Sequence, residues 1–106
     1  MAKKLLLFIF LIISLVSSAA DANRKFTLCI DPGHGGKDTG APGSKSVEKN
    51  INLSVALAFG RYVERNCPDV TVVYTRKTDV FIPLYERAEI ANRKKADLLY
   101  QGNAYK

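Results

Sequence analysis

The sequence has little of the chemistry on which many enzyme sites depend. It holds two cysteines, Cys29 and Cys67, and neither has a C-x-x-C partner, which argues against a redox site and a thiolate zinc site. The G-x-G-x-x-G and G-K-[ST] spacings of phosphate-binding loops are absent. There is no internal repeat and no low-complexity linker. His34 is the only histidine in the chain, so few residues can build a catalytic or metal site.

Acidic residues are outnumbered by basic ones, and the formal net charge is +6. A basic protein suits an anionic partner, such as a cell envelope or a nucleic acid. The basic residues are scattered along the sequence, however, and no motif that reads DNA or RNA accompanies them. We therefore expect no nucleic-acid partner.

The N-terminal residues have the layout of a secretory signal peptide. Lys3 and Lys4 precede an apolar run from Leu5 to Val16, and Ala20-Asp21-Ala22 is an A-x-A-like cleavage site. The run is shorter than the about 20 apolar residues that span a bilayer, so we expect no stable membrane anchor. The sequence predicts a signal peptide over residues 1–22 and export to the periplasm, the cell envelope or the extracellular space.

An exported protein meets conditions in which disulfides form. A bridge between Cys29 and Cys67 stays open, because the sequence does not give the distance between them. Cys29 lies within an apolar segment and is expected to be a small core residue.

Strand and helix patterns alternate along the rest of the chain. Short apolar or β-branched runs predict strands over 26–30, 70–75 and 96–100, and Gly102 is expected to break the chain's continuation of the third strand. Apolar residues at helical spacing predict a helix over 47–66, and Pro83 suits the first turn of a second helix. This order predicts an α/β fold with a mainly parallel sheet, flanking helices and right-handed crossovers.

Each predicted helix has an expected buried face. The face of the first is an apolar stripe of Val47, Ile51, Val55, Phe59 and Tyr62, widened by Leu53 and Leu57. The second has a narrow apolar face, made of Leu84, Ala88 and Ala91. Both faces are expected to pack on the sheet.

His34 and Glu48 are the candidate metal ligands. His34 follows the first predicted strand, and ligand sites of open α/β sheets form at the carboxyl ends of strands. Glu48 begins the first helix, where the helix dipole also favours a carboxylate by about 0.3–1 kcal/mol without any functional role. One histidine and one glutamate on neighbouring elements are two-thirds of a His₂Glu zinc site.

Four segments in order resemble one known family. They are IDPGHGGKD (30–38), VEKNINL (47–53), VYTR (73–76) and PLYERAEIAN (83–92), and they are similar to those of the zinc-dependent N-acetylmuramoyl-L-alanine amidases of the amidase-3 type. The resemblance implies a Rossmann-like domain that hydrolyses the amide between N-acetylmuramic acid and L-alanine in peptidoglycan. It also implies that Zn²⁺ is the cofactor, that His34 and Glu48 are two of three ligands, and that a glutamate takes the proton of the attacking water.

The last residues depart from the family's pattern. Asn103 stands where the family has its third ligand, a histidine, and a neutral amide oxygen is the poorer zinc ligand. The family's catalytic glutamate is expected beyond Lys106, so no catalytic residue is assigned. Residues 23–106 are interpreted as the N-terminal part of the catalytic domain, truncated after about the third strand, and we expect little activity from them. A truncated product and an altered reading frame both explain the departure.

Other charged residues have structural interpretations. Asp31 and Asp38 are expected to hydrogen-bond within the turns that follow them, while Glu86 and Arg87 are expected to be surface charges of a helix. The alternative function is a non-catalytic cell-wall-binding module or an inactive amidase fragment, with an aromatic surface supplied by Tyr62, Tyr85 and Tyr100. The sequence does not predict an oligomeric state.

Overall fold

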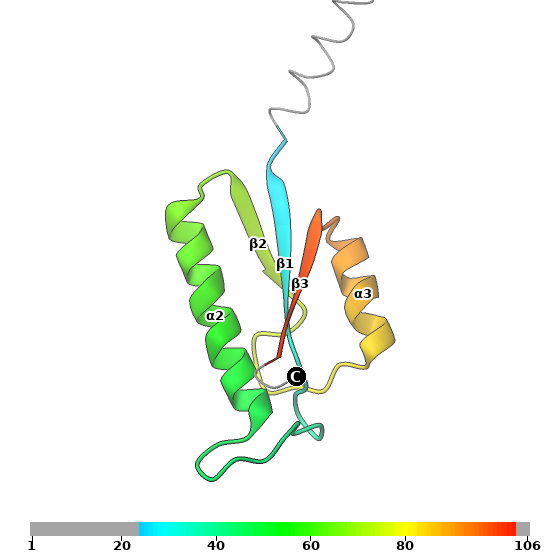
Figure 1. Ribbon diagram of the computed structural model, residues 1–106. Coiled ribbons are helices and arrows are strands. Elements are labelled where there is room, and N and C mark those ends of the chain that lie inside the picture. Colours follow the sequence, from blue (N-terminus) through cyan, green and yellow to red (C-terminus); the bar gives the residue numbers. More distant parts are fainter. Residues whose placement is uncertain (1–23, 104–106) are drawn as a thin grey trace, which may run out of the picture.

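The computed structural model describes residues 24–103, in which strands and helices alternate (Figure 1). The predicted signal peptide lies outside these residues. The elements are β1 (Phe26–Pro32), α2 (Glu48–Asn66), β2 (Val70–Tyr74), α3 (Leu84–Arg93) and β3 (Leu98–Gly102). All five agree in type and order with the sequence analysis.

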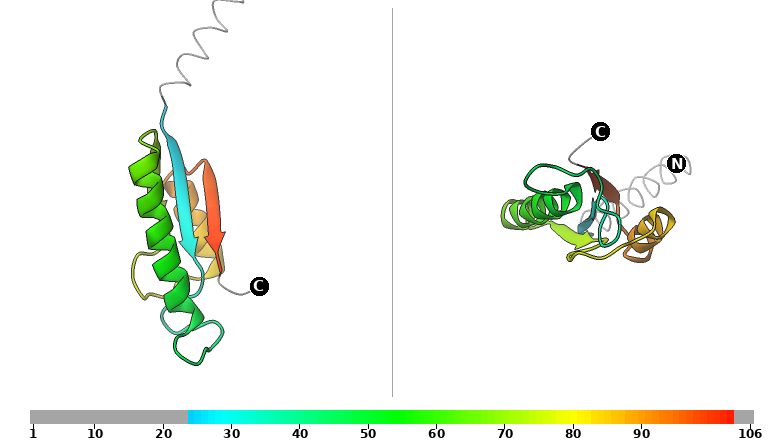
Figure 2. Two further views of the ribbon diagram at one scale, coloured as in Figure 1. Left: turned by 60° about the vertical axis from the view of Figure 1, so that its left-hand side comes forward. Right: turned by 90° about the horizontal axis from the view of Figure 1, so that it is seen from below.

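The sheet has three parallel strands in the order β2-β1-β3, which confirms the predicted α/β class. Seen along the sheet in Figure 2, α2 covers one face and α3 the other. After β1 the chain adds β2 on one side of it, and it then returns past β1 to add β3 on the other side. The direction of winding therefore reverses between β1 and β3. In open α/β sheets, ligands bind at the carboxyl ends of strands at such a reversal.

The hydrophobic core lies between β1 and α2. As expected for a central strand covered on both faces, Leu28, Cys29 and Ile30 are all buried. Leu28 and Ile30 point toward α2, where they pack on Ala56 and Val63. Side chains of β2 complete this cluster: Val70, Val72 and Tyr74.

The predicted buried face of α2 is wrong by one position along the chain. Val55 and Tyr62 are 62% and 66% exposed, and the buried residues are Glu48, Asn52, Ala56, Gly60 and Val63. Small side chains let the helix approach the sheet closely, and the hydroxyl of Tyr74 occupies the space that a side chain on Gly60 would need. Phe59 instead packs on Tyr100 of β3, with 5.3 Å between ring centroids.

The predicted apolar face of α3 is also mostly wrong. Ala91 is buried as expected, but Ala88 is exposed and Leu84 is 83% exposed. The other buried side chain of this helix is Arg87, one turn before Ala91. Arg87 is buried because its guanidinium donates hydrogen bonds to oxygen atoms at the carboxyl ends of the strands.

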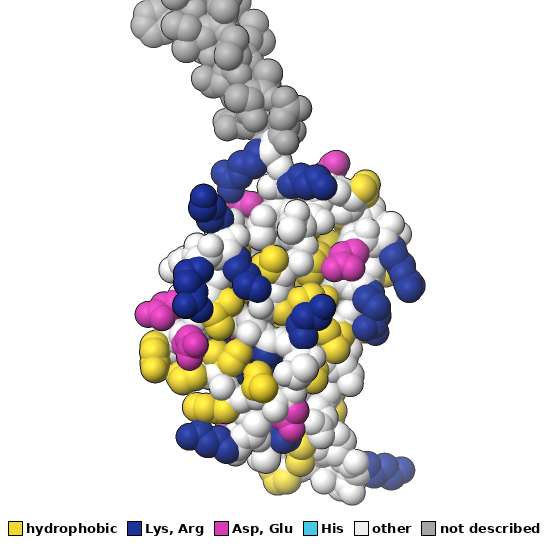
Figure 3. Space-filling view, turned by 180° about the vertical axis from the view of Figure 1, so that it is seen from behind, with side chains coloured by type: hydrophobic (Ala, Val, Ile, Leu, Met, Phe, Trp, Pro, Cys, Tyr) yellow, Lys and Arg dark blue, Asp and Glu magenta, His cyan; other side chains and the backbone are white. Residues whose placement is uncertain are grey.

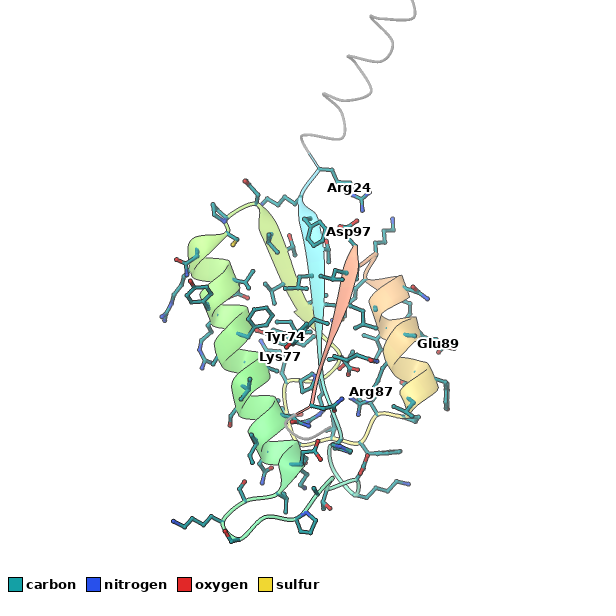
Figure 4. All side chains as sticks on the ribbon, viewed as in Figure 1. Arg24, Tyr74, Lys77, Arg87, Glu89 and Asp97 are labelled. Carbon is teal, nitrogen blue, oxygen red and sulfur yellow. The ribbon has the colours of Figure 1, made fainter. Side chains whose placement is uncertain are left out.

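β3 begins two residues later than predicted and continues through Gly102 without interruption. Its start is fixed by Asp97, whose backbone N–H donates to Thr27 O at 2.8 Å and whose carboxylate accepts from Thr27 N at 2.8 Å. The same carboxylate pairs with Arg24, as Figure 4 shows. At the other end, Gly102 O accepts from Gly33 N at 3.0 Å, so the pairing runs past the glycine.

Both cysteines are free thiols, so the open possibility of a disulfide is not realised. Cys29 is a core residue, as predicted, and burial raises the pKa of its thiol. Cys67 is exposed at the C-terminal end of α2. No helix within residues 24–103 is long and apolar enough to cross a membrane.

Candidate metal centre

A cleft opens at the carboxyl ends of β1 and β3, where the winding of the sheet reverses. Its volume is about 510 Å³, and its lining includes His34 and Asp38 from the loop after β1, Arg87 from α3, and Asn103 directly after β3. This is the place at which the sequence analysis expected a site.

The backbone of His34 is in the left-handed region, with φ 62°. This conformation costs a residue with a side chain about 1–2 kcal/mol, so other contacts must hold it. Gly35 and Asp38 close a tight turn through two backbone hydrogen bonds, of 2.8 and 3.0 Å, which brings Asp38 back to the imidazole. A side chain on Gly35 would overlap the carbonyl oxygen of Val80.

The imidazole of His34 lies between two carboxylates. Its Nδ1 is 2.9 Å from Asp38 Oδ2, and its Nε2 is 3.1 Å from Glu48 Oε2. The hydrogen bond with His34 is the largest cause that lowers the pKa of Asp38. Asp38 also makes the turn contact expected from the sequence, accepting from Gly40 N at 3.3 Å, but its contact with His34 was not foreseen.

Glu48 is fixed and ionised at the first turn of α2. Its side chain is 5% exposed, and Oε1 accepts a hydrogen bond of 3.1 Å from the backbone N–H of Ala41. This bond is the main cause that lowers the pKa of Glu48, and a hydrogen bond from Asn52 adds to it. The structure thus brings His34 and Glu48 together, which the sequence analysis required of a shared metal site.

Asp31 and Arg87 are not what the sequence analysis expected. Asp31 is buried, and its Oδ1 accepts hydrogen bonds of 2.7 Å from Thr75 Oγ1 and from Arg87 Nη1, so it does not serve the turn after it. Arg87 is 3% exposed, so it is not a surface charge. A buried carboxylate requires this kind of compensation, because an unpaired charge is costly in the interior.

Arg87 connects three segments around the cleft. Beyond Asp31, it donates to the carbonyl oxygens of Pro32, His34 and Ile82 at 2.7, 2.9 and 2.9 Å. Figure 4 shows it reaching from α3 toward the strand ends. Glu86, its neighbour in sequence, is not among the residues that line the cleft.

Arg76 supports the same loop from the β2 side. It is buried and donates to the carbonyl oxygens of Pro32, Gly33 and Lys49 at 3.2, 2.9 and 3.1 Å. Burial is the main cause that lowers its pKa. Arg76 belongs to the VYTR segment (73–76), but no role was predicted for it. The available signal was an arginine directly after a β-branched strand, at the edge where the site was expected.

Asn103 lines the cleft beside His34, and its amide oxygen lies where a side chain on Gly33 would stand. It therefore occupies the end of β3 at which a third metal ligand was expected. Within residues 24–103 no three histidine, cysteine, aspartate or glutamate side chains are grouped so that they could hold a metal ion. The donors that fit zinc are one imidazole nitrogen and one carboxylate oxygen, and the remaining group is a neutral amide.

Known proteins match this sequence and this fold. Residues 28–101 match the family described as N-acetylmuramoyl-L-alanine amidase. N-acetylmuramoyl-L-alanine amidase AmiA of Escherichia coli strain K12 is 42% identical over 81 residues, which are 76% of this chain and 27% of AmiA. AmiC of Escherichia coli O6:H1 is 39% identical over 80 residues, 74% of this chain and 19% of AmiC.

Solved structures give the same result. The crystal structure of N-acetylmuramoyl-L-alanine amidase from Clostridium difficile 630 matches with a TM-score of 0.69 at 37% identity, covering 74% of this chain and 43% of that one. The catalytic domain of CwlV, an amidase from Bacillus (Paenibacillus) polymyxa var. colistinus, matches with a TM-score of 0.70 at 38% identity, covering 74% of this chain and 45% of CwlV. This chain spans less than half the length of these relatives.

Proposed function

Since the chain belongs to the N-acetylmuramoyl-L-alanine amidase family, we propose that its cleft serves the hydrolysis of the amide between N-acetylmuramic acid and L-alanine in peptidoglycan. We also propose that it does so with a zinc ion held by His34 and Glu48. The chain covers only part of its relatives, and His34 and Glu48 are the two ligands proposed within it.

The pairing of His34 Nε2 with Glu48 Oε2 carries the metal assignment. When the ring proton is on Nδ1, where the ionised Asp38 accepts a hydrogen bond, the lone pair of Nε2 is directed toward Glu48. A lone pair and a carboxylate oxygen 3.1 Å apart repel each other unless a cation or a proton lies between them. Imidazole nitrogen and carboxylate oxygen are both usual zinc ligands.

The residues around this pair prepare it for the metal. Asp38 orients the imidazole, as carboxylates behind metal-binding histidines do. The N–H of Ala41 and the amide of Asn52 keep Glu48 ionised and in place. When bound, zinc supplies Lewis acidity that polarises a carbonyl and makes water more acidic. The proton-accepting glutamate of the family is not assigned to any residue of this chain.

The cleft suits a substrate that is part of a large polymer. It lies at the carboxyl ends of β1 and β3, and its lining combines apolar side chains such as Phe81 with polar ones such as Gln101. Lys and Arg side chains are spread over the surface and not gathered in one stripe, as the face seen in Figure 3 illustrates. This distribution suits a general attraction to an anionic envelope better than a nucleic-acid groove. We propose that the protein is exported there.

Peptidoglycan binding without cleavage is the second candidate, and Asn103 is the observation that favours it. A zinc site normally takes at least three protein ligands, and a neutral amide oxygen replaces the third. The three tyrosines of the predicted aromatic surface are all exposed. Tyr62 and Tyr85 come from helices on opposite faces of the sheet, however, so they do not form one continuous surface.

One experiment separates the two candidates. The purified chain is incubated with peptidoglycan, with zinc or with a chelator, and both co-sedimentation and released L-alanine-terminated peptides are measured. Because little activity is expected from residues 23–106, zinc-dependent co-sedimentation that is lost in Glu48→Gln supports the hydrolase site, with or without release. Zinc-independent co-sedimentation without release supports the binding module, and neither signal contradicts both.

A further inference from the structure

His34 is held in an unfavourable backbone conformation, and both its side chain and its carbonyl oxygen make hydrogen bonds. Its neighbours Gly35 and Gly36 take positive φ angles without steric cost, whereas His34 has a side chain and a φ of 62°. Such outliers persist only where surrounding contacts fix them, and they gather at functional sites.

The side chain that holds the carbonyl oxygen of His34 is Arg87, through Nη2 at 2.9 Å. A left-handed residue turns its carbonyl in a different direction from an extended one, so a donor fixed at this point selects the left-handed form. Arg87 is suited to the task because a planar guanidinium presents several donors in a rigid fork. Its Nη1 holds the carbonyl oxygen of Pro32, two residues before His34, at 2.7 Å.

Arg87 is itself immobilised by its burial and by its partners. Asp31 Oδ1 accepts from it at 2.7 Å, and the same oxygen is fixed by Thr75 Oγ1 at 2.7 Å. Ile82 O accepts from Nε at 2.9 Å, directly before α3. The guanidinium is therefore anchored to β1, to the residue after β2 and to the start of α3, and from there it reaches the loop of His34.

We infer that Arg87 is the positioning residue of the metal centre, which locks His34 in its left-handed conformation and so presents Nε2 to Glu48. This inference rests on the proposed zinc site for its functional meaning, but its conformational part holds without metal. Asp38 orients the ring from the side-chain end, whereas Arg87 fixes the backbone from which the ring projects.

The test uses the full chain and the variant Arg87→Lys, which keeps the charge beside Asp31 but cannot hold two carbonyl groups in a fork. Val63→Ala is the matched control, because it weakens the core at the opposite end of α2 and leaves all contacts of Arg87 intact. Two quantities are measured by NMR. One is the pair of three-bond couplings HN–Hα and HN–Cβ of His34 in metal-free protein, which together report the sign of φ, and the other is the Kd for Zn²⁺ from the signals of the single imidazole.

We expect Arg87→Lys to lose the left-handed signature of His34 and to bind zinc at least tenfold more weakly, while Val63→Ala retains both values. A left-handed His34 in Arg87→Lys with unchanged zinc affinity would overturn the inference. If wild-type His34 signals do not respond to zinc, the proposed function fails, and the two couplings still test Arg87. If Arg87→Lys does not fold, the wild-type guanidinium protons decide: slow rotation and slow exchange support the lock, and free rotation contradicts it.

Discussion

Asp38 Oδ2 lies 2.9 Å from His34 Nδ1, four residues back along the same tight loop. A carboxylate in this position favours the ring proton on Nδ1, which leaves Nε2 for a metal. The relationship is local in sequence, so the orienting group of the histidine comes from its own loop.

Removing that carboxylate should weaken the metal site without removing a ligand. For Asp38→Ala we expect zinc affinity to fall about 10–100-fold, the usual effect of losing a group behind a metal-binding histidine. Titration calorimetry measures it. Asp69→Ala is the control, because it makes the same change of charge at an exposed position in the connection from α2 to β2. Equal loss of affinity in both variants would assign the effect to net charge.

Removing the proposed ligands should abolish zinc binding. His34→Ala and Glu48→Gln each leave only one of the two proposed zinc ligands, so we expect no detectable binding in calorimetry. Cys29→Ala should bind zinc normally and lose only stability, by about 1 kcal/mol, because it trims a buried core side chain. Zinc binding by His34→Ala with wild-type affinity would show that the ion sits elsewhere.

A histidine at the end of β3 should strengthen the site. Asn103 lines the cleft beside His34, and Asn103→His replaces a neutral amide oxygen with an imidazole. We expect zinc affinity to rise at least tenfold, which corresponds to about 1.4 kcal/mol. Asn103→Gln, which keeps the amide, should change little. An unaltered affinity in Asn103→His would mean that this position does not face the metal.

The close approach of α2 to β2 should be sensitive to one methyl group. A side chain on Gly60 would overlap the Tyr74 hydroxyl, so Gly60→Ala should destabilise the protein by about 1–3 kcal/mol, despite the better helix propensity of alanine. Urea unfolding measures the change. Ser54→Ala, at an exposed position of the same helix, should shift the free energy of unfolding by no more than about 0.5 kcal/mol.

Stability should fall in acid, partly through Asp79. Its hydrogen bond from Lys49 is the main cause that lowers its pKa in the folded protein. A carboxyl with a lowered folded pKa stabilises the fold above its unfolded pKa of about 4, and this contribution is lost as the pH falls through the folded value. We expect Asp79→Asn to be less stable than wild type at pH 7, with the difference shrinking below about pH 4 in urea titrations. A constant difference across this range would contradict the assignment.

The order of elements was predictable because it depends on local patterns. The β-branched run before Thr75 and the apolar run before Asp31 are strands in the structure, with ends moved by one or two residues. The parallel sheet followed from their alternation with helices. The contact between His34 and Glu48 was predictable as well, because a loop after a strand and the helix that follows it both start at the carboxyl end of such a sheet.

The buried faces of the helices were not predictable in the same way. A periodicity argument selects the most apolar stripe, and in α2 that stripe includes Val55 and Tyr62, which are exposed. The face that packs on the sheet combines small residues with the polar side chains of Glu48 and Asn52, and these are buried where they contact His34 and Gly33 in the loop after β1. Apolar periodicity carries no information on such a face.

Arg87 was misjudged for a related reason. An arginine in a helix rich in charged residues has the sequence pattern of a solvated surface, and its partners are far away in the chain. Asp31 lies 56 residues before it. Only the three-dimensional structure reveals that the carbonyls at the end of β1 need a donor from outside their own strand.

β1 is synthesised first but lies at the centre of the sheet, so it can pair only with strands that are synthesised after it. The first strand of the described chain is the central one, and its partners lie far ahead: Asp31 bonds Thr75 across 44 residues, and Thr27 bonds Asp97 across 70. Long chain segments must close into loops before these strands pair, and this closure costs conformational entropy before the pairing stabilises the protein. Folding is therefore slower than in domains with local contacts. The strand made first is therefore the last to have both edges paired, because the edge that β3 covers stays open until β3 has been made.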